Sequence, residues 1–178
     1  RPEAAQEAAK VAADCKRLGV PHDILAWTGW DGRGNLPDQA RRARYGLMAR
    51  WARAQGIACI AIAHTADDQA ETFLMRLARG AGVDGLSAMS ERFESDGVTL
   101  CRPALSVFRH ELREVLEDRG MSWVDDPSNE DLRYERVKAR AALQEMAPLG
   151  IMAASLVTVA RQMSDVRKTL YLHALEAA

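Results

Sequence analysis

Cysteine is scarce in this sequence, with three widely spaced residues, Cys15, Cys59 and Cys101, among 178. An odd, dispersed set argues against a disulfide framework and against a zinc site, and it suits a reducing compartment. Long apolar runs are also lacking: no stretch approaches the roughly 20 residues that a membrane-spanning helix needs, and no signal-peptide pattern opens the chain. These absences predict a cytoplasmic protein with no membrane partner.

Net charge is nearly absent as well, at −1 for 24 basic and 25 acidic residues, so overall charge does not by itself indicate a nucleic-acid partner. The arginines are nevertheless concentrated in two segments, residues 41–53 and 133–140. A single charged run is most often a solvated helix face. The length and the 48% apolar fraction predict one large globular domain, or one domain with a small appendage.

Hydrophobic periodicity predicts helices over residues 2–18, 38–55, 66–79, 106–119 and 132–144 and from residue 151 onward, with Asp38 and Ser106 near two of the starts. Strands are predicted over residues 20–27 and 57–63, and Asp96-Gly97 predicts a hairpin turn. The alternation of helix and strand indicates an α/β fold with a parallel sheet flanked by helices. Because few strands are visible, we expect an incomplete sheet in residues 1–104 and a mainly helical subdomain in residues 105–178.

The stretch from residue 57 to residue 80 carries the densest chemistry. Its first seven residues are apolar without alternation, which predicts a strand covered on both faces, with Cys59 buried. His64, Asp67, Asp68 and Glu71 follow at the start of the next predicted helix. Ligands of α/β proteins bind where parallel strands end and helices begin. We therefore place a candidate active site here.

Two of these carboxylates lie on one side of the predicted helix. With Thr65 as N-cap, Asp68 and Glu71 are three residues apart, so their Cβ atoms lie roughly 5–6 Å from each other. Such a pair can hold an ammonium group or a magnesium ion. Asp67 points about 100° away, and a charge that caps the helix explains it equally well. His64 can contact a phosphate or accept a proton.

Basic residues downstream leave two explanations open. Arg76 and Arg79 can bind phosphate, but arginine near a helix C-terminus is favourable without a ligand, and Gly80 can simply end the helix. Arg133, Arg136 and Arg140 recur at helical spacing and form one basic stripe. A stripe of this kind can bind a nucleic-acid backbone, although a solvated face is the more usual explanation.

Taken in order, these motifs resemble the bacterial tRNA(Ile)-lysidine synthetases. The second signature of that family is similar to His64-Thr-Ala-Asp-Asp-Gln-Ala-Glu71-Thr with Arg76 and Arg79-Gly80 behind it. Other blocks of the family are similar to Gln39-Ala-Arg41-Arg42-Ala-Arg44-Tyr45, Arg102-Pro-Ala-Leu105 and Trp123-Val-Asp-Asp-Pro-Ser-Asn129. The matches span roughly residues 36–140 in the family's order, and their specificity comes from that order.

The resemblance implies a PP-loop (N-type ATP pyrophosphatase) fold and an ATP- and Mg²⁺-dependent ligase. Members of that family adenylate the wobble cytidine in the CAU anticodon of an isoleucine tRNA, and free L-lysine then displaces AMP to give lysidine. By resemblance, His64, Asp68 and Glu71 are catalytic, with Asp68 and Glu71 holding lysine or the metal. Arg76, Arg79 and Gly80 are then substrate-binding, and the tRNA-binding candidates are Arg41, Arg44, Asn129, Arg133, Arg136 and Arg140. A second copy of the chain counts among the candidate partners.

One departure limits the resemblance. The family's Ser-Gly-Gly-x-Asp-Ser loop, which cradles the ATP phosphates, does not occur here, and Gly32-Arg-Gly34 is no substitute because no Ser follows it. We therefore expect a sequence that begins inside a catalytic domain and is inactive by itself. The alternatives are another tRNA-modifying enzyme of the same fold, such as a thiolase, an amidating synthetase of that fold, and a non-catalytic tRNA-binding fragment. Thiolation often uses a pair of cysteines to carry or receive sulfur, and the dispersed Cys15, Cys59 and Cys101 do not supply one, which counts against the thiolase.

Overall fold

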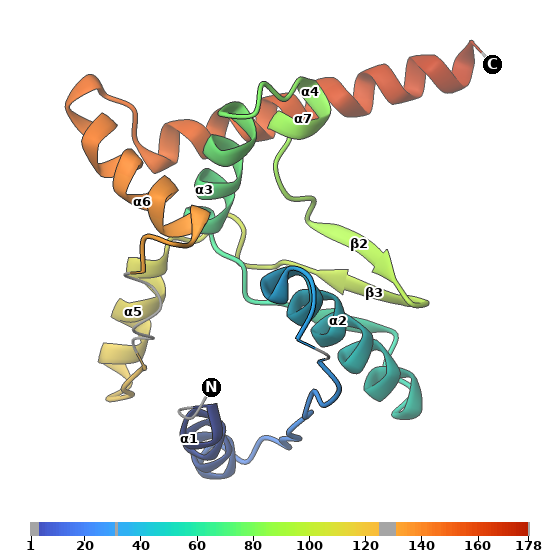
Figure 1. Ribbon diagram of the computed structural model, residues 1–178, viewed down its shortest axis with the longest axis vertical. Coiled ribbons are helices and arrows are strands. Elements are labelled where there is room, and N and C mark those ends of the chain that lie inside the picture. The colour runs from blue at the N-terminus through green and yellow to red at the C-terminus, as the bar shows by residue number, and fades with distance from the viewer. Residues whose placement is uncertain (1–3, 31, 125–130, 178) are drawn as a thin grey trace. The chain divides into compact units, whose positions relative to one another are not determined.

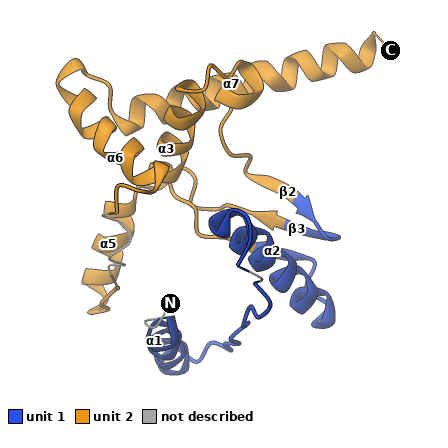
Figure 2. Cartoon of the chain, viewed as in Figure 1, with its two compact units in different colours: residues 1–60, 94–99 blue, residues 61–93, 100–178 orange. Residues whose placement is uncertain are grey.

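The computed structural model describes residues 4–30, 32–124 and 131–177 (Figure 1). The chain forms two compact units: residues 1–60 with 94–99, and residues 61–93 with 100–178 (Figure 2). Each unit has its own small apolar core. Ala49, Ala52 and Val98 are buried in the first, and the second is built around Phe73 and Leu156. The predicted boundary between residues 104 and 105 stays a prediction.

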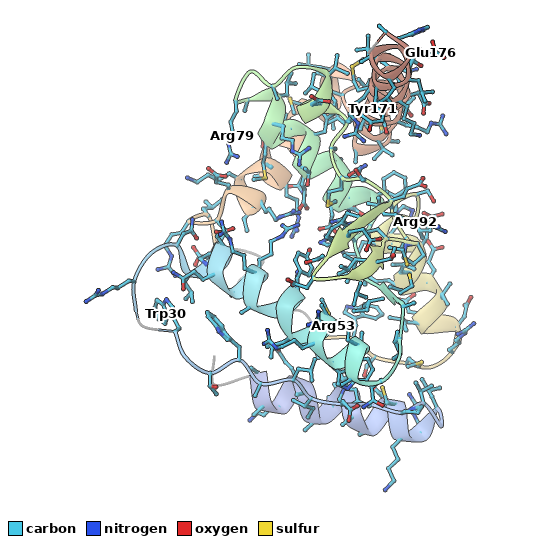
Figure 3. All side chains as sticks on the ribbon, turned by 90° about the vertical axis from the view of Figure 1, so that its right-hand side faces the viewer. Trp30, Arg53, Arg79, Arg92, Tyr171 and Glu176 are labelled. Atoms are coloured by element: carbon cyan, nitrogen blue, oxygen red, sulfur yellow. The ribbon has the colours of Figure 1, made fainter. Side chains whose placement is uncertain are left out.

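In the first unit, α1 (Ala4–Arg17) ends before Gly19, whose φ of +68° suits a helix terminator. The strand predicted over residues 20–27 is wrong, because this segment has no regular secondary structure and leads to the loop that carries Trp30 (Figure 3). Val20 and Ile24 are more than half exposed. An apolar segment becomes a strand only when another strand pairs with it. Here a side-chain contact holds the segment instead: Trp51 Nε1 donates to Asp23 Oδ2 at 2.9 Å.

The second helix of this unit, α2 (Leu36–Ala54), begins two residues before the predicted start. Asn35 caps it by accepting a hydrogen bond from the backbone N–H of Asp38 at 3.3 Å, and a proline occupies its first turn. Asparagine at the N-cap and proline just inside are both favourable, because the first helical N–H groups have no partner within the helix. The predicted helix was therefore right in kind and late by half a turn.

The sheet has three strands, β1 (Cys59–Ala61), β2 (Arg92–Ser95) and β3 (Val98–Cys101), in the order β1-β3-β2. Parallel strands are present as predicted, because the N–H of Thr99 donates to the Ala58 carbonyl of the segment leading into β1 and the N–H of Ile62 donates to the Cys101 carbonyl at the end of β3. The pairing itself was not predicted, because the expected sheet joined residues 57–63 to a strand over residues 20–27. The predicted hairpin is also confirmed. Asp96 and Gly97 both have positive φ, as a tight hairpin turn between right-twisted strands requires.

The burial predicted for β1 is wrong. Cys59 and Ala61 are exposed, and only Ile60 between them is half-buried. β1 is an edge strand with β3 on one side, whereas Val98 and Leu100 of the central strand β3 are fully buried. A continuous apolar run predicts a strand, but its burial depends on the layers around it.

The second unit is mainly helical, as predicted for the later part of the chain. Its helices are α3 (Ala66–Leu77), α4 (Val83–Leu86), α5 (Arg109–Asp118), α6 (Glu135–Met146), the 3-10 helix η2 (Ala147–Leu149) and α7 (Ala153–Glu176). In Figure 1, α3 packs against both α6 and α7, and α4 packs against α7. The helix α3 is thus central to this unit, and its first two turns carry the candidate carboxylates Asp67, Asp68 and Glu71.

Two predicted helix starts shift in this unit. α5 begins at Arg109 with Phe108 as its N-cap, three residues after Ser106, because the Glu111 carboxylate accepts the N–H of Phe108 at 2.6 Å. α6 begins at Glu135 instead of residue 132. Before it, the Asp131 side chain accepts the N–H of Arg133 at 2.9 Å and forms a turn. An acidic side chain thus caps the start of α5, whereas α6 begins after the Asp131 turn with Tyr134 as an N-cap that makes no side-chain capping bond.

Gln69 on α3 fixes the connection that follows α4. Its side chain is 8% exposed, its Nε2 donates to the Met89 carbonyl at 2.9 Å, and its Oε1 accepts the N–H of Met89 at 2.8 Å. This paired contact satisfies a buried backbone group as a neighbouring strand would. We call it the Gln69 clamp.

Among the described residues, no single helix has the length and apolar composition needed to cross a membrane. One pair, Glu135–Leu149 with Ala153–Glu176, meets the length and composition test together, and it is bent by 102°.

Candidate active site

Asp68 caps the helix on which it lies. Its Oδ2 accepts the backbone N–H of Thr65 at 2.9 Å and the Thr65 hydroxyl at 3.0 Å. Thr65 is the N-cap of α3, so this is the carboxylate half of a capping box. One oxygen of Asp68 is thus committed to structure, and the other, Oδ1, is the oxygen that meets the arginines.

Asp67 caps a different helix from the one expected. Its Oδ2 accepts the backbone N–H of Arg109 at 2.7 Å, the first residue of α5. In the opposite direction, the N–H of Ala66 donates to the Val107 carbonyl at 2.9 Å. The first turn of α3 is therefore joined reciprocally to the residues at the start of α5. The alternative explanation of Asp67 as a capping charge is right in kind, with α5 as the helix that it caps.

Glu71 is a buried carboxylate held by two arginines of α6. Its side chain is 2% exposed. Arg140 places Nε at 3.0 Å and Nη2 at 2.9 Å from Oε1, while Arg136 Nη1 lies 3.3 Å from Oε2. The same Nη1 is 3.4 Å from Asp68 Oδ1, so Arg136 bridges the two carboxylates. Charge-assisted bonds of this kind compensate for the burial of a carboxylate.

The explanation of the basic stripe as a solvated helix face is therefore wrong for two of its three arginines. Arg136 and Arg140 are about two-thirds buried and turn onto α3. Arg133 precedes the helix, has a side chain that is 87% exposed, and pairs with Asp131 at 2.7 Å. The predicted tRNA-binding residue Asn129 lies outside the described residues.

Sequence reasoning missed a third arginine. Arg109 Nη2 lies 3.7 Å from Asp68 Oδ1 and 4.0 Å from Glu71 Oε1. We call the five residues Asp68, Glu71, Arg109, Arg136 and Arg140 the arginine–carboxylate cluster. Its three guanidinium groups and two carboxylates leave one positive charge in excess. Nothing in the sequence near Arg109 marks it, because the contact depends on how α5 docks on α3.

The donor set of the cluster suits an anion better than a metal ion. Both oxygens of Glu71 already accept hydrogen bonds from guanidinium groups, and a cation would have to displace them. Within residues 4–30, 32–124 and 131–177 there is no group of three or more His, Cys, Asp or Glu that could hold a metal. These residues do not fit magnesium in this arrangement, and the metal role stays a prediction. Guanidinium groups of side chains that are about one-third exposed, with excess positive charge, fit a phosphate.

His64, at the end of the stretch that follows β1, is held by an arginine. Arg102 Nε donates to His64 Nδ1 at 3.2 Å. The Arg102 side chain is itself buried, with the residue 7% exposed, and its Nη1 donates to the Ser90 carbonyl. The orientation of the imidazole is thus set from outside its own segment.

At the C-terminal end of α3, Arg76 and Arg79 contact other groups of this chain. Arg76 Nη1 donates to the carbonyls of Gly85 and Ala88 at 2.9 and 2.7 Å, which ties α4 to α3. Arg79 pairs with Glu135 at the start of α6, and Gly80, with φ +70°, ends the helix. These contacts supply the structural explanation that the sequence left open, and substrate binding by the three residues stays a prediction.

The remaining candidates, Arg41 and Arg44, belong to the first unit. Both lie on α2, and their guanidinium carbons are 5.5 and 5.4 Å from the centre of the Tyr45 ring. This is the range of cation–π contacts. Arg44 is exposed, so its charge faces solvent.

Comparison with known proteins defines the class first. The sequence profile described as PP-loop domain matches residues 1–147, so the chain belongs to the PP-loop domain family. The expected fold is thereby confirmed. A solved structure agrees: the U34-tRNA thiolase NcsA from Methanococcus maripaludis, with its 4Fe-4S cluster, superposes with a TM-score of 0.70 over 90% of this chain and 56% of that chain. At 14% identity this likeness shows the fold alone.

Particular relatives share much more sequence. The chain is 54% identical over all of its 178 residues to the tRNA(Ile)-lysidine synthase of Ruegeria pomeroyi, of which it covers 42%. The enzymes of the same name from Bradyrhizobium diazoefficiens and Wolbachia pipientis are 43% and 38% identical over 92% and 96% of this chain, and 45% and 40% of their own lengths. The chain thus spans less than half the length of these relatives.

Proposed function

We propose that this chain is part of a tRNA(Ile)-lysidine synthase, which uses ATP to join L-lysine to the wobble cytidine in the CAU anticodon of an isoleucine tRNA. The observation that carries the proposal is the 54% identity over every residue of the chain to an enzyme of that name. ATP supplies the adenylyl group that activates the cytidine. The cytoplasm is the expected location, which three cysteines without a disulfide bond suit.

The arginine–carboxylate cluster gives this chain two tasks in that reaction. Asp68 is the carboxylate within reach of an incoming amine, since its side chain is 19% exposed and that of Glu71 only 2%. The lysine amine would be positioned against Asp68 and must lose a proton before it attacks the activated cytidine. Glu71 would hold Arg136 and Arg140 in place, so its effect on the substrate would run mainly through them.

Phosphate binding is the second task. Arg109 and Arg136 are each about one-third exposed at the side chain, and the cluster carries one excess positive charge. They would bind a phosphate of the nucleotide or of the anticodon backbone, because guanidinium groups match phosphate geometry. Arg41, Arg44, Arg133 and Arg140 remain candidate tRNA contacts, as do Arg76, Arg79 and Gly80 for the nucleotide.

Lysine-dependent release of AMP tests the proposal. The full-length protein that contains this chain should release AMP only when ATP, lysine and an isoleucine tRNA with a CAU anticodon are all present. A transcript with a UAU anticodon is the matched control. AMP release that needs sulfide and ignores lysine would identify a thiolase, and release without tRNA would identify a metabolic synthetase. Binding of tRNA with no AMP release at all would leave only a binding module.

Two substitutions test the assignment of residues. Asp68→Asn and Glu71→Ala should each reduce lysidine formation by at least about 100-fold, the usual loss when a positioning or electrostatic group is removed. Asp68→Asn should chiefly raise the KM for lysine. Glu114→Ala, on the exposed side of α5, is the control. Wild-type activity in the folded Glu71→Ala enzyme would remove Glu71 from the site.

A further inference from the structure

The contact between Arg102 and His64 fixes more than an orientation. Arginine carries only N–H donors and no acceptor. Because Arg102 Nε lies 3.2 Å from His64 Nδ1, that nitrogen must present its lone pair to Arg102. A neutral imidazole carries one hydrogen, and with Nδ1 as acceptor the hydrogen resides on Nε2.

Arg102 is itself held too firmly to move away from the ring. It is 7% exposed, its Nη1 donates to the Ser90 carbonyl, and its guanidinium carbon lies 4.3 Å from the centre of the Phe93 ring. A buried arginine with a backbone acceptor and an aromatic face has little rotamer freedom left. On the histidine side, the backbone N–H of His64 donates to the Ile62 carbonyl at 3.0 Å. Arg102 is therefore held at its side chain, and His64 is held at its backbone.

We propose that Arg102 is a positioning residue that keeps His64 neutral with its hydrogen on Nε2, so that His64 donates a hydrogen bond to a substrate oxygen instead of accepting a proton. Protonation at Nδ1 would turn an N–H toward the N–H of Arg102 and set two cations side by side, which is unfavourable. The acceptor is an oxygen of the kind that phosphate and nucleobase carbonyl groups present. This assignment rests on the proposed function and decides between the two roles that the sequence left open for His64.

Nitrogen NMR of the imidazole rings tests the tautomer without any reaction. In the full-length protein, ¹⁵N-histidine labelling with a His64→Gln variant identifies the signals of His64 as those that the variant loses. At pH 7.5 we expect Nε2 with a pyrrole-type shift and a bound hydrogen, and Nδ1 with a pyridine-type shift. A hydrogen on Nδ1, or on both nitrogens, would overturn the proposal whatever the enzyme does.

The role of Arg102 is tested in the same spectra. Arg102→Met should release the restraint and give averaged shifts from both tautomers, while Arg102→Lys, which restores a cationic donor, should recover part of the wild-type pattern. Arg92→Met on β2, an exposed arginine nearby in sequence, should change nothing (Figure 3). If Arg102→Met folds and the His64 signals keep their wild-type shifts, Arg102 does not position the ring.

Amide substitutions separate a donor from a base. The amide nitrogen of glutamine reaches the place of Nε2, and that of asparagine reaches the place of Nδ1. For a donor, we expect His64→Gln to keep lysidine formation within about 10-fold of wild type and His64→Asn to lose 100-fold or more, the usual loss when a preorganised donor is removed. Equal losses in both variants would identify a base and overturn the proposal.

Binding measurements identify the oxygen. ATP and an anticodon stem–loop RNA are titrated separately into the full-length wild-type, His64→Gln and His64→Asn proteins. The ligand whose Kd rises in His64→Asn and not in His64→Gln carries the oxygen that accepts the hydrogen bond. The proposal is supported whether that ligand is ATP or the RNA. Unchanged Kd values for both ligands, together with unchanged kcat, would overturn the donor role. The NMR result stands apart from lysidine formation, so a failed ligase assay and a failed tautomer are distinguishable.

Discussion

Two arginine-rich segments that look alike in the sequence have opposite environments in the structure. Arg136 and Arg140 on α6 turn onto the carboxylates of α3 and are about one-third exposed. Arg41 and Arg44 on α2 lie over the ring of a neighbouring tyrosine of their own helix, and Arg44 is exposed. Helical spacing places arginines on one face, but the element that packs against that face decides whether the charges are structural or available to a partner.

Among the substitutions that test this contrast, replacing Glu71, the carboxylate that Arg136 and Arg140 share, should change stability the most. Glu71→Gln leaves Arg136 and Arg140 with a neutral acceptor in a site where the carboxylate was 2% exposed. Hydrogen bonds to charged groups contribute about 1.5–3 kcal/mol each, so we expect the free energy of unfolding to fall by about 2 kcal/mol. Urea denaturation checks this, with Glu114→Gln on α5 as control. A loss below that of the control would mean that the cluster does not stabilise the fold.

Removing one arginine from each segment sharpens the comparison. Arg140→Met deprives Glu71 Oε1 of two hydrogen-bond donors and should cost about 1.5 kcal/mol. Arg44→Met should change stability by less than about 0.5 kcal/mol, as is usual for surface positions. A double-mutant cycle with Glu71→Gln should give coupling for Arg140 and none for Arg44. Equal effects of the two arginine substitutions would erase the distinction between the segments.

Arg44 on α2 should affect the binding of RNA, whereas Arg140 on α6 should affect the stability of the fold. Under the proposed function, Arg44→Gln should weaken binding of the isoleucine tRNA and reduce the slope of log K against log salt by about one unit for each phosphate that the side chain neutralises. Arg42→Gln is a matched control, since Arg42 is paired with Asp38 at 2.9 Å on the same helix. Identical salt slopes for wild type and Arg44→Gln would argue that Arg44 does not bind a phosphate.

The smallest effect concerns pH and the turn before α6. Hydrogen bonds from the Arg133 side chain, and then from its backbone, hold the pKa of Asp131 below its ordinary value of 3.8. Because the folded-state pKa is the lower one, the stabilisation is present above the unfolded value and is lost as pH falls through the folded value. Urea midpoints measured between pH 5 and pH 2 should therefore fall less in Asp131→Asn than in wild type. Parallel curves for the two proteins would contradict this.

The helices and the hairpin could be predicted because local chemistry determines them. Asp96-Gly97 supplies the two positive φ angles of the turn, and Gly19 and Gly80 end helices where the periodicity stops. The predicted helix starts were off by a few residues because more than one nearby side chain could cap each helix. The sequence alone does not show which of them does so. Asn35 is the N-cap of α2, where Asp38 was expected near the start. The contact of Glu111 with the backbone makes Phe108 the N-cap of α5, where Ser106 was expected.

The candidate site was only partly predictable, because its contacts join residues far apart in the chain. The spacing of Asp68 and Glu71 correctly placed two carboxylates on one side of a helix. No local pattern connects Glu71 with Arg140, 69 residues later, or Asp67 with Arg109, 42 residues later. The prediction that Cys59 is buried was wrong for a related reason. An apolar run does not show how many strands will flank it in the sheet.

The Gln69 clamp also provides a natural reporter of folding. The N–H of Met89 is buried and bonded across a gap of 20 residues to a side chain on α3. That amide can exchange its hydrogen with solvent only when the connection after α4 separates from α3. The exchange rate of one backbone amide, followed in heavy water, would therefore measure how often the core of the helical unit opens.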